Sequence, residues 1–194
     1  MKTKFKMALL GGTVFAVAVL SFGYGKYSRL DVVHEIYGGS TQFQTGASYQ
    51  LCFVPDGDSC QDLVVAAIDS TKAQLRVQAY SFTSKPIAEA LKRAKERGVD
   101  VKVILDESQV SQKYSGATFL RNTGLDVVID TKPAIAHNKV MVFDKSGVFT
   151  GSFNFTKAAQ ERNAENGLII RGDYALTSAY LANWEQRYRV SSRY

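Results

Sequence analysis

The segment at residues 135–156, IAHNKVMVFDKSGVFTGSFNFT, places an imidazole and an ammonium group in an otherwise apolar stretch. His137 and Lys139 are two residues apart, and residues i and i+2 of a β-strand point to the same side of the sheet. A buried lysine needs an anionic partner, and an imidazole can act as a nucleophile or as a general acid and base. We therefore favour chemistry on a negatively charged substrate over a core histidine beside a lysine that reaches for solvent.

Two further polar side chains in this segment can join the pair. We expect residues 138–143 and 147–151 to form a hairpin, which brings Ser152 and Asn154 next to the histidine and the lysine. Hydroxyl and amide groups can donate hydrogen bonds to phosphate oxygens, as the ammonium can. Asp144 has the opposite parity and opens the turn sequence Asp-Lys-Ser-Gly, so we expect it to act mainly through stability at the end of the strand.

The type and spacing of these residues resemble the full HKD signature of the phospholipase D superfamily: His137-x-Lys139, then Asp144 after four residues, then Gly151-Ser152-x-Asn154 after six. Glu165 stands where that family has a glutamate that orients the histidine. The stretches QAYSFTSKPIAEAL, RGVDVKVILDE and GSFNFTKAA, with ENGLII, are also similar to the small, single-motif, exported bacterial endonucleases of the Nuc type. The resemblance covers roughly residues 49–190.

The resemblance implies a reaction that uses two histidines. One attacks phosphorus and forms a phosphohistidine, and the other protonates the leaving oxygen and later activates water. This chain has one motif, so the resemblance implies a homodimer in which two copies of His137 meet at a two-fold axis. His34 is an unsuitable substitute because no lysine follows it two residues later. Lys139, Ser152 and Asn154 would hold the phosphoryl oxygens, so neither a metal ion nor another cofactor is expected.

The expected substrate is DNA, with RNA as a further candidate, cleaved with low sequence specificity. Tyr80 and Phe82 are candidates for base stacking or for the core. Basic residues that could contact phosphates are Lys85, Lys92, Arg93, Lys113, Arg121 and Lys157.

Three other functions are compatible with parts of the sequence. A phospholipase or cardiolipin hydrolase would use the same site. A nucleic-acid-binding protein without activity could share the scaffold, although such a protein is expected to lose its motif histidine or lysine first. A metal-dependent nuclease would use Asp106, Glu107 and Asp144 and would be sensitive to chelators.

The N-terminus reads as a targeting segment. Lys2, Lys4 and Lys6 precede an uncharged apolar run at residues 7–22, which is typical of a secretory signal. We predict a signal peptide at residues 1–23, with an uncleaved membrane anchor as the alternative, and a periplasmic or secreted protein. Loss of those three lysines would lower the formal charge from +6 to +3, which permits a polyanionic partner without requiring one.

The remaining chain suits one domain, because 194 residues that are 45% hydrophobic and 22% charged can form a real core. Residues 24–48 contain many polar residues and glycines and little periodicity, so we expect a linker or arm before a folded domain at residues 49–194. Cys52 and Cys60 flank a Pro-Asp-Gly turn, and export favours a disulfide between them over two reduced thiols. No metal site is expected from them.

Alternating strand and helix patterns predict an α/β fold, in which a mixed, largely parallel β-sheet is sandwiched between helices as in phospholipase D. In the last expected helix, Leu176, Tyr180 and Trp184 recur every four residues and predict a core-facing stripe. The expected strands are 49–54, 74–82, 99–106, 125–130, 138–143, 147–151 and 167–170, and the expected helices are 62–72, 85–98, 115–124 and one from residue 173.

Overall fold

The computed structural model describes residues 41–110 and 116–194. The predicted signal peptide, residues 24–40 of the predicted arm, His34 and Lys113 lie outside these ranges. Residues 43–194 form one compact unit. Within the described residues, none of the helices combines the length and the apolar character needed to cross a membrane.

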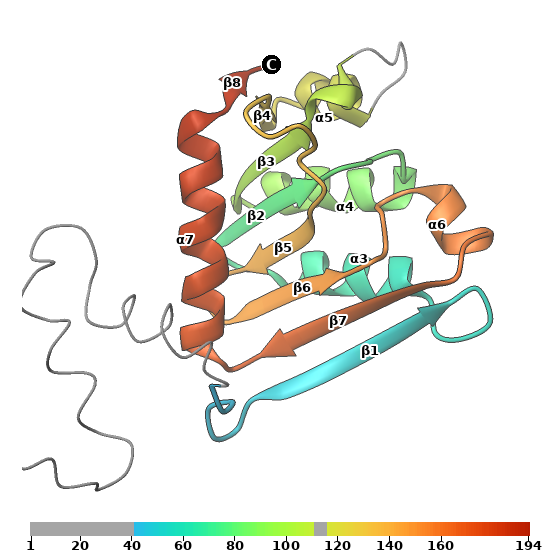
Figure 1. Cartoon of the computed structure of the whole chain (residues 1–194), viewed down its shortest axis with the longest axis vertical. Helices are drawn as coiled ribbons and strands as arrows, with labels where there is room; N and C mark the ends of the chain where they lie inside the picture. Colours follow the sequence, from blue (N-terminus) through green and yellow to red (C-terminus); the bar gives the residue numbers. More distant parts are fainter. Residues whose placement is uncertain (1–40, 111–115) are drawn as a thin grey trace, which may run out of the picture. The chain divides into compact units, whose positions relative to one another are not determined.

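An eight-stranded sheet is built by the described residues, in the spatial order β1-β7-β6-β5-β2-β3-β4-β8 (Figure 1). Strand β2 pairs in parallel with β3, and β3 with β4, while the other five pairings are antiparallel. The strands are β1 Ser48–Val54, β2 Gln74–Ala79, β3 Asp100–Asp106, β4 Asp126–Asp130, β5 Lys139–Phe143, β6 Gly147–Gly151, β7 Glu165–Arg171 and β8 Ser192–Arg193.

The predicted α/β sandwich with a mixed sheet is confirmed, although its parallel part is smaller than expected. The reason is the length of the connections. Parallel neighbours need a crossover of about a dozen residues or more, which α4 supplies between β2 and β3 and the segment with α5 supplies between β3 and β4. Only residues 144–146 separate β5 from β6, so this pair must be an antiparallel hairpin, as its sequence predicts.

Helices cover both faces of the sheet. Strands β2, β5 and β6 lie between the helices of one face and α7, Tyr174–Val190, on the other (Figure 1). The 3-10 turn Glu107–Gln109, helix α6 and strand β8 were not predicted from the sequence. The helices of the first face are α3 Cys60–Ser70, α4 Lys85–Glu96, α5 Gly116–Asn122 and α6 Lys157–Glu161.

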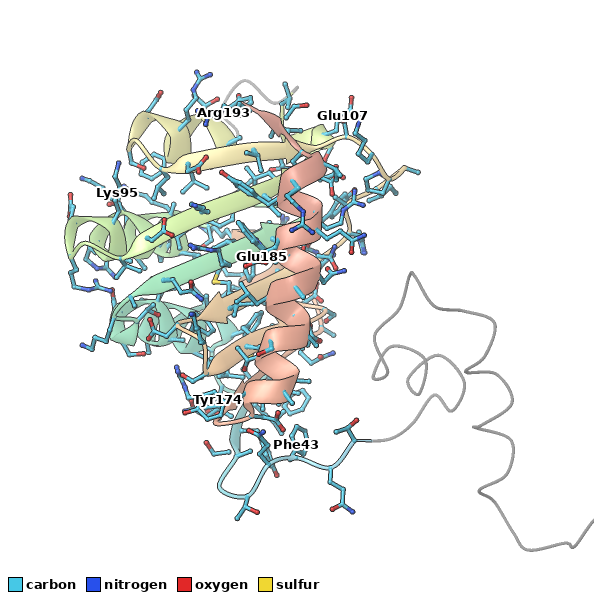
Figure 2. The ribbon with its side chains drawn as sticks, turned by 90° about the vertical axis from the view of Figure 1, so that its left-hand side faces the viewer. Phe43, Lys95, Glu107, Tyr174, Glu185 and Arg193 are labelled. Carbon is cyan, nitrogen blue, oxygen red and sulfur yellow. A yellow bond between two sulfur atoms is a disulfide. The ribbon has the colours of Figure 1, made fainter. Side chains whose placement is uncertain are left out.

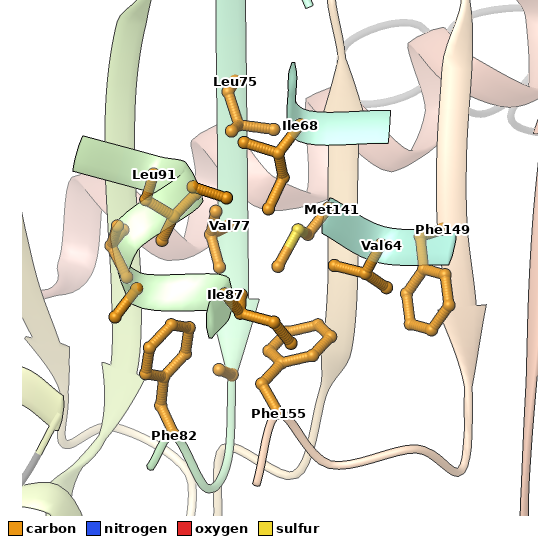
Figure 3. Close-up of a cluster of buried hydrophobic side chains, with 14 of the residues drawn as sticks. Val64, Ile68, Leu75, Val77, Phe82, Ile87, Leu91, Met141, Phe149 and Phe155 are labelled. Atoms are coloured by element: carbon orange, nitrogen blue, oxygen red, sulfur yellow. The ribbon is translucent and has the colours of Figure 1, made fainter. Parts of the chain in front are cut away.

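The main core lies between the sheet and this first helical layer (Figure 3). The predicted apolar stripe of α4 is fully buried there, with Ile87, Leu91 and Ala94 each 0% exposed. Burying one such leucine or isoleucine side chain is worth about 1.5–3 kcal/mol. Phe82 and Phe155 close the end of this core, where their rings meet edge to face with centroids 6.0 Å apart.

Helix α7 is fixed to the opposite face by specific polar contacts as well as by packing. Trp184 is 2% exposed, and its indole Nε1 donates a hydrogen bond of 2.9 Å to the carbonyl of Val77 in β2. Arg187 donates two hydrogen bonds, of 2.6 and 2.7 Å, to the buried carboxylate of Asp130. Of the three residues predicted to face the core from α7, Trp184 is buried as expected, while Leu176 and Tyr180 are only half-buried. Strand β2 is therefore held from both sides.

The predicted disulfide between Cys52 and Cys60 is present and joins β1 to the first residue of α3, with the two Cα atoms 5.1 Å apart. Gly167 faces Cys52 in the β1–β7 register. A Cβ atom at that position would lie 2.7 Å from the sulfur of Cys52 and 2.6 Å from the ring of Phe149. Glycine is therefore required there for the disulfide and this ring to pack together.

Part of the predicted arm is attached to the domain. The Gln44 backbone N–H donates to the Asp173 carboxylate at 3.0 Å, and the Tyr174 backbone N–H donates to the Gln44 side chain at 2.9 Å. These contacts lie at one end of α7, near Phe43, while Glu107 and Arg193 lie at the other end (Figure 2).

Candidate active site

Four strand ends converge at one end of the sheet and carry the residues of the motif. Strand β5 begins at Lys139, which pairs with Ala79 at the end of β2. Strand β6 ends at Gly151, which pairs with Gly167 near the start of β7. Antiparallel pairing therefore brings the segment before β5, the loop after β6 and the start of β7 to the same edge.

His137 is exposed and lies two residues before Lys139, the first residue of β5. Its ring lies against Tyr80, with the ring centroids 4.5 Å apart and the planes tilted by 53°. The backbone N–H of Tyr80 donates to the carbonyl of Asn138 at 2.8 Å, which extends the β2–β5 pairing toward the histidine. An exposed imidazole on a fixed backbone is suited to nucleophilic attack on an approaching phosphorus atom.

Lys139 is 6% exposed, and its ammonium group makes no ion pair with a carboxylate in the described part of the chain. Its Nζ donates to the carbonyl of His137 at 3.0 Å and lies 5.0 Å from the centroid of the Tyr80 ring. Burial lowers the pKa of Lys139 below its ordinary value of 10.5, and the charge of Glu165 opposes that shift. A buried cation without a direct counterion favours the binding of an anion.

Ser152 and Glu165 form a hydrogen-bonded pair. The hydroxyl of Ser152 donates to Glu165 Oε2 at 2.6 Å and accepts from the backbone N–H of Asn166 at 3.1 Å. The other carboxylate oxygen, Oε1, accepts from Asn163 Nδ2 at 2.9 Å. Both oxygens of Glu165 are thus engaged by Ser152 and Asn163, so the expected role of Glu165 in orienting His137 stays a prediction.

Asn154 lies between two fully buried phenylalanines, Phe153 and Phe155, which anchor its backbone. Its side-chain oxygen Oδ1 is buried and lacks a hydrogen-bond partner among the described residues. Buried polar atoms are nearly always hydrogen-bonded, so this unpaired acceptor can take a hydrogen bond from a donor group of a ligand. Gly151 permits the tight loop before Asn154, because a Cβ atom there would lie 2.4 Å from the Asn166 carbonyl oxygen.

Asp144 lies at the other end of β5, and the structure does not bring it to the site. Five strand residues separate it from the segment that carries His137, or about 17 Å at about 3.3 Å per residue. Its carboxylate accepts hydrogen bonds from the backbone N–H groups of Lys72, Ala73 and Gln74, between 2.7 and 3.2 Å. The contacts are those of a structural residue that fixes the start of β2.

Asp106 has a positioning role that the sequence did not reveal. Its carboxylate accepts from the backbone N–H of Ser108 at 2.9 Å and from that of Ala136 at 2.7 Å. Burial alone would raise the pKa of Asp106, but these hydrogen bonds outweigh it and hold the pKa below the ordinary value of 3.8. Asp106 thus secures the residue before His137. Asp144 lies in the turn between β5 and β6 and bonds the start of β2, so the structure does not bring it together with Asp106 and Glu107 as a metal-dependent site would require. Among residues 41–110 and 116–194, no three His, Cys, Asp or Glu side chains are grouped as metal ligands.

Tyr80, Asn163 and Asn166 also lie at the site, with contacts that the sequence did not predict. Tyr80 lies against both the imidazole and the ammonium group. Asn163 and Asn166 bond Glu165 and Ser152, respectively. The density of polar residues in RNAEN, immediately before an apolar strand, was the available signal for the two asparagines.

The fold and the site define an α/β protein with an imidazole, a buried ammonium group and an amide gathered at one sheet end, which is an arrangement suited to phosphoryl groups. A family model described as "Cardiolipin synthase, PLD-like domain" matches residues 64–188. The chain belongs to this phospholipase D-like family, and the resemblance inferred from the HKD signature is confirmed.

Individual relatives support the same assignment. A "Phospholipase D" of Rickettsia typhi is 45% identical over 136 residues, which are 70% of this chain and 66% of that protein. The crystal structure of Nuc, a phospholipase D family member from Salmonella typhimurium, has a TM-score of 0.72 and 38% identity, and the match covers 76% of this chain and 98% of that one. The "Mitochondrial cardiolipin hydrolase" of Homo sapiens is 32% identical over 122 residues, or 63% of this chain and 48% of that protein. The chain thus spans just under two thirds of the rickettsial relative and about half of the human one.

Proposed function

We propose that the protein is a metal-independent phosphodiesterase that cleaves DNA or RNA internally through a phosphohistidine, with an active site completed by a second copy of the chain. The observation that carries the proposal is the exposed imidazole of His137 beside the buried, uncompensated ammonium group of Lys139. Family membership supports the chemistry, and the similarity to Nuc supports the nucleic-acid substrate.

In the first step, a neutral His137 attacks the phosphorus atom of the diester. A nitrogen–phosphorus bond forms, the bond to the leaving oxygen breaks, and the protonated His137 of the second copy gives its proton to that oxygen. In the second step, the second imidazole takes a proton from water as the water attacks phosphorus. The nitrogen–phosphorus bond then breaks, which releases a phosphomonoester and regenerates both histidines.

The charge that develops on the phosphoryl oxygens needs preorganised donors. Lys139 supplies an ammonium group in a poorly hydrated place, and we propose the amide N–H₂ of Asn154 as the second donor. Fixed donors of this kind act more strongly in such a site than in water, and removing one costs on the order of 10²–10³ in rate. Ser152 acts mainly by holding Glu165, because its own hydrogen-bonding capacity is already used.

Two observations support a homodimer. The chain has a single motif, whereas the proposed reaction uses two histidines. Two large apolar side chains at the same end of the sheet as His137 are also exposed. Ile135, two residues before His137, is 55% exposed, and Phe53, next to the last residue of β1, is 57% exposed. Large apolar side chains around a site are suited to coverage by another protein surface.

The dimer can be tested by subunit mixing. Wild-type protein is unfolded and refolded with increasing amounts of His137→Asn protein. If each site needs two intact histidines, activity per total amount of protein falls as the square of the wild-type fraction. A linear fall, or full activity in a species that sediments as a monomer, would contradict the dimer.

The substrate can be tested with chelation and one variant. Wild-type and His137→Asn proteins are incubated with plasmid DNA, RNA and phospholipid vesicles in EDTA. We expect wild type to cleave nucleic acid in EDTA and the variant to be inactive. Vesicle hydrolysis without nucleic-acid cleavage would favour the second candidate, a phospholipase or cardiolipin hydrolase, which the names of the rickettsial and human relatives support.

Export is also part of the proposal. The Cys52–Cys60 disulfide is of the kind that persists in oxidising compartments, and the basic and apolar N-terminal sequence is typical of a secretory signal. We propose a periplasmic or secreted enzyme, with membrane attachment only if the N-terminal segment is retained. Fractionation of cells, followed by N-terminal sequencing of the mature protein, distinguishes the two forms.

A further inference from the structure

A cavity of about 280 Å³ opens beside the site, between the end of β2 and helices α4 and α5. Its walls are the loop at residues 82–85, Ala88 of α4, and Gly116 and Phe119 of α5. Helix α5 approaches this loop closely, because a Cβ atom at Gly116 would lie 2.7 Å from the ring of Phe82. The cavity is therefore formed by fixed backbone segments rather than by chance spacing of surface side chains.

The cavity adjoins the catalytic residues through two backbone connections. Phe82 forms a parallel bridge with Phe155, the residue after Asn154. Tyr80, which lies against His137, precedes Phe82 by two residues. Three residues span at most about 10 Å, so the mouth at Thr83 lies within about 10 Å of the backbone of Tyr80.

The walls and the rim of the cavity differ in chemistry. Phe82 is fully buried and held by Phe155, while Phe119 is 37% exposed and can present its ring to a ligand. Thr83 and Lys85 are exposed at the mouth. Ser84, the N-cap of α4, places the positive end of a 12-residue helix there. An aromatic wall below a cationic rim suits a base joined to a phosphate.

Within the described ranges, Lys85 differs from the other basic residues that the sequence offered for phosphate contacts. Arg93 bonds Asp69 at 2.7 Å, and Lys157 lies 3.6 Å from Glu161. The ammonium group of Lys85 has neither a carboxylate nor an aromatic ring as a partner in the described part of the chain. It is thus available for a phosphate at the mouth of the cavity.

We propose that this cavity binds an unpaired nucleobase of a single-stranded nucleic acid while the scissile phosphate lies at His137. The inference rests on the proposed function and adds a preference for single strands, because a base that is stacked within a duplex cannot enter. Phe119 stacks on the base, and Lys85 contacts the adjoining phosphate. A lipid with a single phosphate is a less favourable occupant, because it would leave Lys85 without an anion, and cardiolipin, which carries two phosphates, is distinguished by the test.

The test compares substrates of different length in wild-type and Phe119→Ala proteins. Measurements of kcat/KM use a single-stranded oligonucleotide, its duplex, bis(4-nitrophenyl) phosphate and cardiolipin vesicles. The informative quantity is kcat/KM for the oligonucleotide divided by kcat/KM for the small diester. Loss of one stacking contact should lower this ratio on the order of tenfold, mainly because KM for the oligonucleotide rises. Phe119→Trp should retain the ratio, and Lys85→Ala should reduce the salt dependence of oligonucleotide binding by about one phosphate contact.

Tyr174→Ala is the matched control, because Tyr174 is an aromatic residue that is 60% exposed in the first turn of α7. An unchanged ratio in Phe119→Ala, or equal wild-type KM for single strand and duplex, would overturn the cavity assignment while leaving the proposed function intact. Lower activity of Phe119→Ala on cardiolipin alone would identify a lipid-chain site instead. Hydrolysis of the small diester without cleavage of any oligonucleotide by wild type would reject the proposed function itself.

Discussion

The carboxylate of Asp106, at the end of β3, accepts a hydrogen bond of 2.7 Å from the backbone N–H of Ala136, the residue before His137. The other carboxylate oxygen accepts from the backbone of Ser108 at 2.9 Å. One buried side chain therefore connects a central strand to the segment that carries His137, the proposed nucleophile. Catalytic groups must be held in a narrow range of positions, so this contact should affect the reaction without touching the substrate.

Asp106→Asn should lower kcat on the order of tenfold with little change in KM, since misplacement of about 1 Å can cost up to about 10² in rate. Asparagine can accept only one of the two hydrogen bonds, and its amide N–H₂ would face a backbone N–H. Glu107→Gln is the matched control, because it removes a neighbouring exposed charge at the same end of β3. Equal loss of kcat in both variants would indicate a general charge effect rather than positioning.

Asp144→Ala should destabilise the fold and spare the chemistry. Asp144 has a φ of +52°, and its carboxylate accepts three backbone N–H groups from residues 72–74. Loss of these bonds should lower the free energy of unfolding by about 2 kcal/mol in urea titrations. Asn tolerates this φ, so Asp144→Asn should cost less. A stable Asp144→Ala protein that is as inactive as His137→Ala would place Asp144 in catalysis instead.

The central strands could be predicted from the sequence because β2, β3, β5 and β6 combine apolar runs with clear turn sequences. Helix α6 was not predicted, since five residues of KAAQE carry too little periodicity. The predicted strand at 167–170 began too late, because Glu165 and Asn166 are polar although they pair with Val54 and Phe53 of the edge strand.

The residues of the site also differ in whether they could be predicted from the sequence. His137, Lys139, Ser152 and Asn154 could be identified because their spacing is local and depends on strand parity. The contact between Asp106 and Ala136 joins residues 30 positions apart and leaves no periodic trace in the sequence. From the sequence, Phe82 could either stack on a base or pack in the core. Its ring is fully buried against Phe155, so it is a core residue.

Lys139→Met should abolish activity and raise stability at neutral pH. The pKa of Lys139 is lowered by burial, so between that pKa and the ordinary value of 10.5 the unfolded chain binds more protons than the folded protein. Stability therefore rises with pH through this window, and at lower pH the cost of the buried cation is present in full. We expect the methionine variant to be about 1 kcal/mol more stable at pH 7, with the difference shrinking toward pH 10.5.

Inorganic phosphate provides the control for this stability effect. If the ammonium group of Lys139 binds an anion, phosphate should raise the Tm of wild type and not that of Lys139→Met. A methionine variant that is less stable than wild type at pH 7 would mean that the contacts of Lys139 with the His137 carbonyl and Tyr80 already compensate its charge.

The Cys52–Cys60 disulfide should contribute modestly to stability. It closes a short loop, with a sequence separation of 8, so its contribution should lie below the roughly 3 kcal/mol expected for a loop of about 15 residues. The contribution of the disulfide to the free energy of unfolding can be measured by guanidinium titrations with and without reductant. These compare wild type with the double variant Cys52→Ala/Cys60→Ala. A reductant should destabilise only wild type. Intact mass showing two free thiols in exported protein would contradict the bridge.

The most direct measurement of the central claim is the mass of the enzyme trapped during turnover. Wild-type protein is mixed with a labelled single-stranded oligonucleotide in EDTA, quenched at alkaline pH and digested, and the peptide with His137 is identified by mass spectrometry. The proposed mechanism predicts an acid-labile adduct, in which the phosphate of one cleavage fragment is joined to His137, and this adduct is absent from His137→Asn. Cleavage that EDTA abolishes and magnesium restores, with no adduct on His137, would contradict it.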